Sequence, residues 1–175
     1  MRILALCGSQ RTASWSAALL RAAKELAPAG VDVELFQDHK RLALFNPELE
    51  SAPPAEALSL RAAVSAADAI VIASPEYAHG VTGTIKNTLD WLVSHEPFAF
   101  KPVAVFNPSY QSYHADEALK ETLRMMSADL IADACVRIPV IGAGVPADAI
   151  AAEPRFADAI RAALQAIVAH VDGRR

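Results

Sequence analysis

Three short, uninterrupted runs of apolar residues constrain this chain more than any other feature. They are Ile3–Cys7, Ala69–Ala73 and Pro102–Phe106. Gly8 ends the first run, and the pair Ser74-Pro75 ends the second. A strand that is buried on both faces of a sheet has this pattern, because polar residues do not alternate with apolar ones along it. The runs therefore predict the central strands of a parallel sheet covered by helices on both sides.

Between these runs, apolar residues recur at the spacing of a helix. Helices are expected over about residues 14–27, 54–66, 82–94, 115–126 and 154–171, with further strands over about residues 31–35 and, less clearly, 134–138. Strands that alternate with helices are joined by right-handed crossovers and form a parallel sheet. The pattern predicts an α/β chain with a five-stranded, flavodoxin-like sheet, organised as a single domain over residues 1–175.

Composition excludes several classes of function. The formal net charge is -4 and no basic tract is present, which argues against nucleic acid as a partner. No apolar stretch reaches the roughly 18 residues of a membrane span, and the first residues do not resemble a signal peptide, so we expect a cytoplasmic protein. Cys7 and Cys135 lie in apolar surroundings and are expected to be buried thiols. No set of residues suggests a metal site.

The loop after the first strand, residues 8–16, has the properties of a phosphate site. It leads into a helix, and the unpaired N–H groups of a helix start attract anions. Arg11 can form two hydrogen bonds to a phosphate, and Ser9, Ser14 and Ser16 supply hydroxyl groups. The alternative is that Ser14 or Ser16 only caps the helix and that Arg11 is a solvated cation. The loop has neither the dinucleotide fingerprint nor a P-loop.

The loop after the third strand is stiff. Pro75 fixes one φ angle, while Gly80 and Gly83 allow turns that other residues resist. Exposed amides and the ring of Tyr77 form an edge against which a planar heterocycle could lie. An ordinary connection from a strand to a helix is the alternative.

Taken together, the two loops make the chain similar to the NADPH-dependent FMN reductases, which include chromate, quinone and azo-dye reductases. The family's first loop reads Gly-Ser-x-Arg-x-x-Ser-x-Asn, and its third loop reads Pro-Glu-Tyr-Asn before a Gly-x-Leu-Lys-Asn-x-x-Asp-Trp helix. Most of both patterns is present here: Gly8, Ser9, Arg11, Ser14, Pro75, Glu76, Tyr77, Gly83, Lys86, Asn87, Asp90 and Trp91. The resemblance covers most of the chain.

The resemblance implies a flavoprotein with FMN as its cofactor. The phosphate would be held by the first loop, through Ser9, Arg11, Ser14 and Ser16, and Trp15 would also contact the cofactor. The isoalloxazine would lie along Pro75, Glu76 and Tyr77. In the family, the helix that carries Lys86 and Asp90 often packs on a second subunit, so a homodimer or homotetramer is expected. The apolar stripe of this helix (Ile85, Leu89 and Leu92) could equally belong to the chain's own core.

Three departures from the family pattern bear on the pocket. Ser16 and Ala78 each stand where asparagine is usual. In place of a loop with two glycines, residues 107–114 read Asn-Pro-Ser-Tyr-Gln-Ser-Tyr-His. This bulkier loop could narrow the pocket, change the acceptor or weaken flavin binding. Asn107 and Ser109 remain candidates for contacts to the flavin.

The expected function is transfer of electrons from NADPH or NADH, through bound FMN, to a flavin, a quinone or a similar small acceptor. The cofactor performs this chemistry, so no side chain is assigned a catalytic role. Glu76 and the lone histidines are expected to be structural or to lie on the surface. One alternative is a flavodoxin-type electron carrier. Another is a relative that has lost the flavin and acts as a binding protein.

Overall fold

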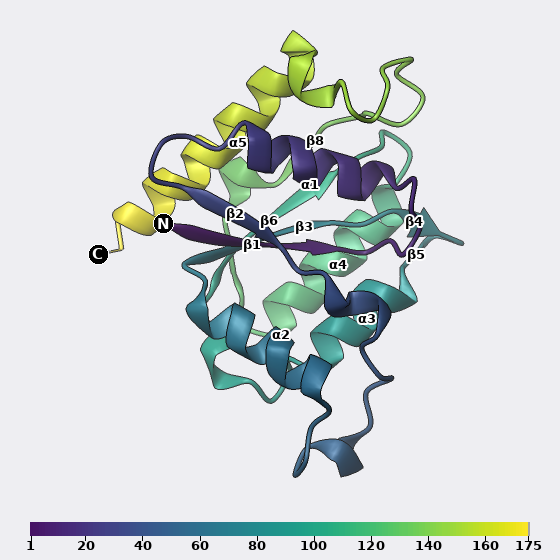
Figure 1. Ribbon diagram of the computed structural model, residues 1–175, viewed down its shortest axis with the longest axis vertical. Coiled ribbons are helices and arrows are strands. Elements are labelled where there is room, and N and C mark those ends of the chain that lie inside the picture. Colours follow the sequence, from purple (N-terminus) through teal and green to yellow (C-terminus); the bar gives the residue numbers. More distant parts are fainter. Residues whose placement is uncertain (175) are drawn as a thin grey trace.

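The computed structural model describes residues 1–174 and shows a parallel sheet between two layers of helices (Figure 1). The strands of the sheet are β1 (Arg2–Cys7), β2 (Asp32–Leu35), β3 (Ala69–Ala73), β6 (Pro102–Asn107), β7 (Asp129–Leu130) and β8 (Val136–Arg137). The helices are α1 (Trp15–Glu25), α2 (Ala55–Ala66), α3 (Gly83–Asp90), α4 (Tyr113–Met125) and α5 (Pro154–Asp172). None of the helices in this part of the chain is both long and apolar enough to cross a membrane.

The strand order is β2-β1-β3-β6-β7, and every pairing in this sheet is parallel. This confirms the predicted flavodoxin-like arrangement. The fifth strand of the sheet differs from the single strand expected at residues 134–138. It is divided into β7, which pairs with the start of β6, and β8, which pairs with its end. A turn at Ala132–Ala134 separates the two pieces, and neither piece is long enough to give a clear pattern in the sequence.

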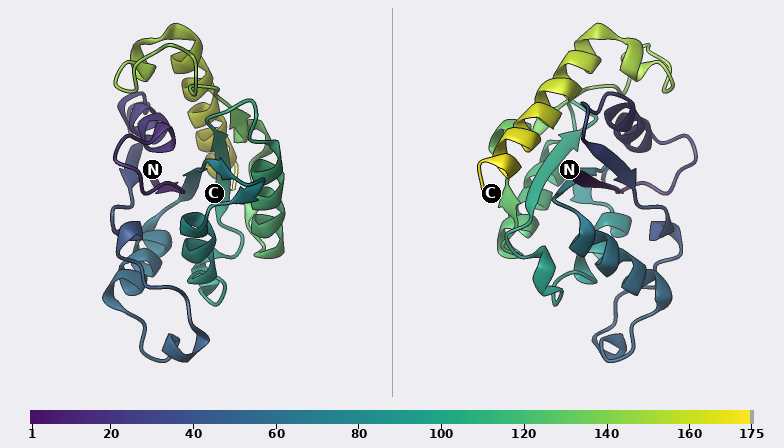
Figure 2. Two further views of the ribbon diagram at one scale, coloured as in Figure 1. Left: turned by 90° about the vertical axis from the view of Figure 1, so that its right-hand side faces the viewer. Right: turned by 60° about the vertical axis from the view of Figure 1, so that its left-hand side comes forward.

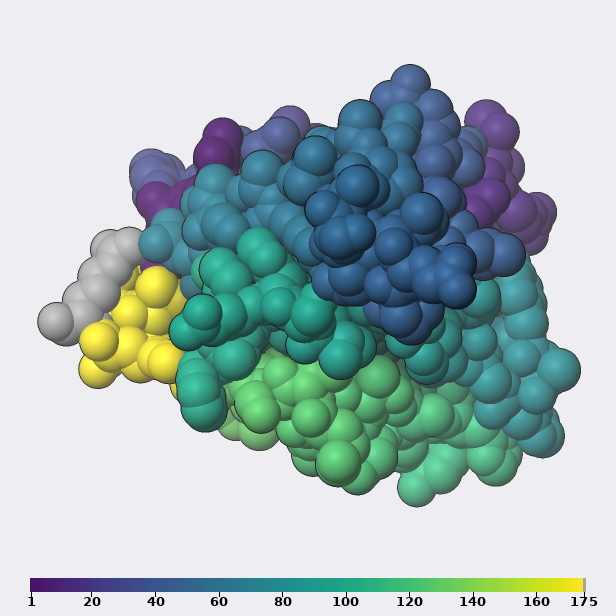
Figure 3. Space-filling model, turned by 90° about the horizontal axis from the view of Figure 1, so that it is seen from below, coloured from purple at the N-terminus to yellow at the C-terminus, as the bar shows by residue number. Residues whose placement is uncertain are grey.

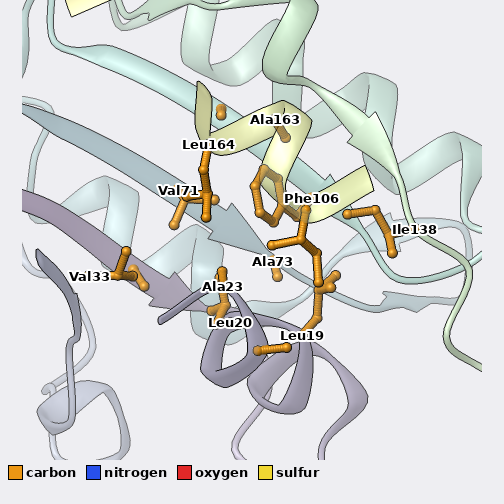
Figure 4. Close-up of a cluster of buried hydrophobic side chains, with 14 of the residues drawn as sticks. Leu19, Leu20, Ala23, Val33, Val71, Ala73, Phe106, Ile138, Ala163 and Leu164 are labelled. Carbon is orange, nitrogen blue, oxygen red and sulfur yellow. The ribbon is translucent and has the colours of Figure 1, made fainter. Parts of the chain in front are cut away.

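The continuous apolar runs serve both faces of the sheet because successive side chains of a strand point to opposite sides. Ile3, Ala5 and Cys7 of β1 pack with α1 and α5, whereas Leu4 and Leu6 pack with α2, α3 and α4. Figure 4 shows the first of these two cores, with Val71 and Ala73 of β3 facing α1 and α5. Both faces are therefore dry, as the sequence predicted.

The helix that matches the family's Lys-Asn-x-x-Asp-Trp motif lies in the chain's own core along one face. Ile85, Leu89 and Leu92 are each only 1% exposed. The apolar stripe is therefore intrachain core, the second of the two interpretations that the sequence allowed. Lys86 and Asp90 form an i,i+4 ion pair on the surface.

The long irregular segment at residues 36–54 is fixed to this helix by side-chain hydrogen bonds. The side chain of Asn87 accepts a bond from the N–H of Phe45 (2.8 Å) and donates one to the carbonyl of Ala43 (3.0 Å). The indole N–H of Trp91 also donates to Ala43, at 2.8 Å. Figure 3 shows the segment in blue, lying against the teal part of the chain. The motif residues Asn87 and Trp91 thus hold a loop of their own chain.

Candidate functional site

A pocket of about 510 Å³ lies at the carboxyl end of the sheet. Figure 2 (left) views the molecule from the side at which β1, β3 and β6 end. In α/β sheets this is the edge at which ligands bind. Four segments line the pocket: the first loop with the start of α1, the loop after β3, the loop after β6, and Ile141. The lining residues are Ser9, Arg11, Ser14, Trp15, Ser16, Pro75, Glu76, Tyr77, Ala78, His79, Ser109, Gln111, Ser112 and Ile141.

The structure brings nine of the ten residues predicted from the sequence to this pocket. They are Ser9, Arg11, Ser14, Trp15, Ser16, Pro75, Glu76, Tyr77 and Ser109. The tenth, Asn107, does not line it. Asn107 is buried, its side-chain N–H donates to the carbonyl of Ser112 (2.8 Å), and its side-chain oxygen accepts from the N–H of Ser109 (3.0 Å). Its amide therefore shapes the loop and is not directed to a ligand.

The first loop is closed by its own side chains. The hydroxyl of Ser9 accepts a hydrogen bond from the N–H of Arg11 (3.3 Å), and that of Ser14 accepts one from the N–H of Ala17 (3.2 Å). Ser14 is therefore the N-cap of α1, as one interpretation of the sequence proposed. The cap satisfies one of the free N–H groups, while those at the very start of the helix have no partner within it. The first turn contains no acidic residue that would neutralise its partial positive charge.

Gly8 is required by the close approach of the first loop to the end of β3. A Cβ atom at this position would lie 2.1 Å from Oγ and 2.5 Å from Cβ of Ser74. The N–H of Gly8 donates to the carbonyl of Ala73 (2.8 Å), and its carbonyl accepts from the hydroxyl of Thr82 (2.6 Å). These bonds fix the two predicted loops relative to each other.

Arg11 projects from this fixed loop as an exposed cation. It forms no ion pair with any residue among 1–174. A guanidinium without a protein partner, beside the start of a helix and several hydroxyl groups, suits an anionic ligand.

The wall opposite the first loop is a short hairpin that the sequence analysis missed. β4 (Glu76–Tyr77) pairs with β5 (Gly80–Val81) in antiparallel fashion, and it projects at the right of Figure 1. The two residues of its turn, Ala78 and His79, have φ angles of 49° and 58°. Such a turn favours asparagine, aspartate or glycine at both positions, so the sequence Ala-His gave no hairpin signal.

Two contacts to α4 hold the hairpin in place. The carboxylate of Glu76 accepts a hydrogen bond from the N–H of Ala115 at 2.7 Å, where it caps the start of α4. The ring of His79 stacks on that of His114, with centroids 4.2 Å apart. Glu76 therefore has a structural partner, as expected of a carboxylate in a turn.

The glycine-free loop at residues 107–114 does not block the pocket. Ser109, Gln111 and Ser112 line its side, while Tyr110 and Tyr113 remain 74% and 56% exposed. The loop curls on itself, since the hydroxyl of Ser109 accepts from the N–H of Gln111 (3.0 Å).

Ile141 is the lining residue that no sequence signal indicated. Its N–H donates to the carbonyl of Pro108 (3.2 Å), which brings the segment after β8 against the loop after β6. The remaining missed residues, Ala78, His79, Gln111 and Ser112, lie within the two loops that the sequence analysis had already singled out. Cys7 lies nearby, and burial raises the pKa of its thiol, so the thiol stays protonated at neutral pH.

Comparison with known proteins decides the family. The family model described as NADPH-dependent FMN reductase matches residues 1–141. The chain belongs to that family. The match confirms the resemblance drawn from the two loops, together with the enzyme class, an NAD(P)H-dependent oxidoreductase, and the cofactor, FMN.

Individual relatives agree with this FMN reductase assignment. The chain is 33% identical to an NAD(P)H-dependent FMN reductase of Pseudomonas aeruginosa over 130 residues, which is 70% of this chain and 69% of that protein. It is 31% identical to a quinone reductase of Escherichia coli over 109 residues, 60% of this chain and 58% of that protein. Among solved structures, the flavoenzyme FerB of Paracoccus denitrificans has the same fold, with a TM-score of 0.87, 22% identity, and coverage of 98% and 97% of the two chains.

Proposed function

We propose that the pocket of this FMN reductase holds FMN with its phosphate at the first loop and its ring system along the hairpin. The convergence of the two loops in one pocket carries this proposal. Its volume of about 510 Å³ falls within the range of roughly 300–1,000 Å³ that is usual for small-molecule sites. The first loop contributes Arg11 and several hydroxyl groups to the pocket, and Pro75–Tyr77 contribute a rigid edge.

The phosphate end would use Arg11, the hydroxyl groups of Ser9 and Ser16, and the N–H groups at the start of α1. Ser9 and Ser16 are only 6% and 1% exposed, so a ligand here meets fixed groups that lose little freedom on binding. Trp15 would cover one side of this end. Asn107, which is engaged inside its loop, is not included in this set.

FMN, when bound, would supply the redox chemistry between NAD(P)H and an acceptor. The chain's own residues bind and orient it. Glu76 fixes the hairpin through α4, and Tyr77, which is 55% exposed, lies at the rim of the pocket where a donor or acceptor would approach.

We propose a quinone or a free flavin as the acceptor, in line with the similarity to a quinone reductase. We also propose a single domain over residues 1–175, a cytoplasmic location and a homodimeric or homotetrameric assembly.

The visible absorption spectrum of the purified protein tests the proposal. We expect flavin bands, or their appearance after incubation with FMN followed by desalting. We further expect oxidation of NADPH that accelerates when a quinone is added. A colourless protein that takes up no FMN would overturn the cofactor site and favour a flavin-free binding protein. Tight FMN binding without oxidation of NADPH or NADH would favour an electron carrier.

A further inference from the structure

A second cavity borders the first loop on its other side. It has a volume of about 350 Å³ and is lined by part of that loop, by α1, by the end of β2, and by Phe36, Gln37, His39 and Lys40 of the segment that follows. Because β2 and β3 flank β1 on opposite sides, this cavity lies toward β2, whereas the proposed FMN pocket lies toward β3. Ser9 and Arg11 line both. The two cavities are therefore neighbours that share one cationic side chain.

Basic side chains from three segments line this second cavity. They are Arg11 from the first loop, Arg21 from α1, and His39 and Lys40 from the segment after β2. No aspartate or glutamate is among the lining residues. Such a grouping is notable in a chain whose formal net charge is -4. It creates a local positive potential that attracts anions.

Three of these cations are left without a carboxylate partner. Within residues 1–174, neither Arg11, Arg21 nor Lys40 forms an ion pair. By contrast, the neighbouring Arg41 pairs with Asp38, at 2.5 Å. The charges of Arg21 and Lys40 also lower the pKa of Cys7 against the larger, opposing effect of burial. Both cations thus act on a group that lines the same cavity.

His39 adds a buried nitrogen atom that lacks a partner. Its Nδ1 lies 3.2 Å from the carbonyl oxygen of Phe36, so Nδ1 must carry the proton of that bond. Its Nε2 is buried and has no hydrogen-bond partner among the residues described. Buried polar atoms without partners are rare in proteins, and an ordered water or ion is one reason for them.

We propose that this cavity is a second anion site that binds the phosphate groups of a nucleotide, and that it receives the phosphate-bearing adenosine end of NADPH. The second part rests on the proposed function, because it requires the nicotinamide to lie in the neighbouring FMN pocket. Arg11, which lines both cavities, provides the cationic bridge between them. The additional 2′-phosphate of NADPH meets three cations here, so the site favours NADPH over NADH.

Titration calorimetry on the FMN-loaded protein tests the anion site, with adenosine 2′,5′-bisphosphate as the probe. The variants are Arg21→Ala, Lys40→Ala and their combination. Lys24→Ala is the matched control, since Lys24 is also an exposed cation of α1 but does not line the cavity. Losing one charged hydrogen bond is expected to weaken binding by about tenfold or more. The control should leave the affinity unchanged. Equal affinities for all the proteins would overturn the site.

Two comparison ligands separate the possible sources of the anion. Adenosine, which has no phosphate, is expected to bind at least about tenfold more weakly than the bisphosphate, because it forms none of the charged hydrogen bonds. Inorganic phosphate should bind more weakly than the bisphosphate but with the same dependence on Arg21 and Lys40. If inorganic phosphate binds as tightly as the bisphosphate, the cavity is a site for the free ion and the nucleotide assignment is wrong.

The donor assignment has its own readout. The ratio of the KM values for NADPH and NADH should rise in Arg21→Ala and Lys40→Ala, because KM for NADPH increases while that for NADH changes little. If this KM ratio is unchanged although bisphosphate binding is weakened, the cavity binds anions but does not bind NADPH. FMN content, read from the visible spectrum of each sample, keeps the two proposals apart. A protein that binds the bisphosphate but no FMN would contradict the proposed function and leave the anion site standing.

Discussion

The two walls of the proposed FMN pocket are held in place by different means. The first loop closes on itself through the hydroxyl groups of Ser9 and Ser14, two and three residues from the N–H groups they bind. The hairpin β4–β5 depends on a helix far along the chain, through a bond between Glu76 and Ala115, 39 residues apart. Beyond Gly8, which is bonded to Ala73 and Thr82, the first wall is closed by bonds between its own residues, whereas the hairpin relies on a distant helix.

The two walls are therefore expected to have different roles in the site. The locally closed loop presents charge and N–H groups at fixed positions, which is what a phosphate needs. The hairpin holds two residues in the left-handed region, a conformation that persists only when the surrounding contacts enforce it. Changes to the exposed side chains of the first loop, such as Arg11, should therefore act mainly on cofactor affinity. Changes in the hairpin should act mainly on stability.

The largest effect is expected for Arg11→Ala. The variant removes the unpaired cation at the phosphate end, and losing hydrogen bonds to a charged group should raise the Kd of FMN by about 10- to 150-fold. Quenching of flavin fluorescence on binding measures this Kd. Arg11→Lys keeps the charge but lacks the planar guanidinium group. Its Kd for FMN should therefore lie between those of the natural protein and of Arg11→Ala. Unchanged affinity in Arg11→Ala would remove this residue from the site.

Gly8→Ala is expected to affect both stability and cofactor binding. The new methyl group would overlap Oγ and Cβ of Ser74, and such overpacking should lower the free energy of unfolding by about 1–3 kcal/mol. Urea denaturation measures this change. Gly83→Ala is the control, because a Cβ there meets no atom within 4 Å. The double variant Gly8→Ala, Ser74→Gly should recover part of the loss, and no recovery would show that the overlap with Ser74 is not the cause.

Glu76→Ala probes the anchor of the other wall. Removing the carboxylate that caps α4 should lower the free energy of unfolding by about 0.5–2 kcal/mol, the usual value for a cap. Thermal or urea denaturation measures it, and Glu76→Gln should lose less because its side-chain oxygen can still accept the bond from Ala115. FMN content should change little in either variant. Loss of NADPH oxidation in Glu76→Gln at full FMN occupancy would instead give Glu76 a chemical role.

The smallest effect is expected at the tip of the hairpin. Ala78→Asn places a residue that tolerates positive φ where alanine has a φ of 49°, which should stabilise the protein by about 0.5–1 kcal/mol. Ala78→Val, with a branched side chain at the same φ, should destabilise it. The difference in melting temperature between the two variants is the measurement. If the asparagine variant is less stable than the natural protein, the turn is not strained as described.

The parts of the site that the sequence predicted share a physical property. Ser9, Arg11 and Ser14 follow a clear strand and precede a clear helix, so their place at the sheet edge follows from the chain direction. Pro75–Tyr77 follow the next central strand for the same reason. Ile141 could not be predicted, because it belongs to a distant segment that is bonded to Pro108. Asn107 was placed near the pocket by its position at the end of β6, but its amide turned inward to satisfy the loop that follows.

The sequence by itself determined the alternation of strands and helices, the two apolar faces of the sheet and the position of the loop proposed to hold the phosphate, because these depend on local periodicity and on residues close together in the chain. Only the tertiary structure decided that the glycine-free loop leaves the pocket open, that a hairpin forms from Glu76 to Val81, and that Arg21 and Lys40 converge beside Arg11. These features depend on contacts between distant segments. Their free energy comes from neighbours that no local pattern of residues reveals.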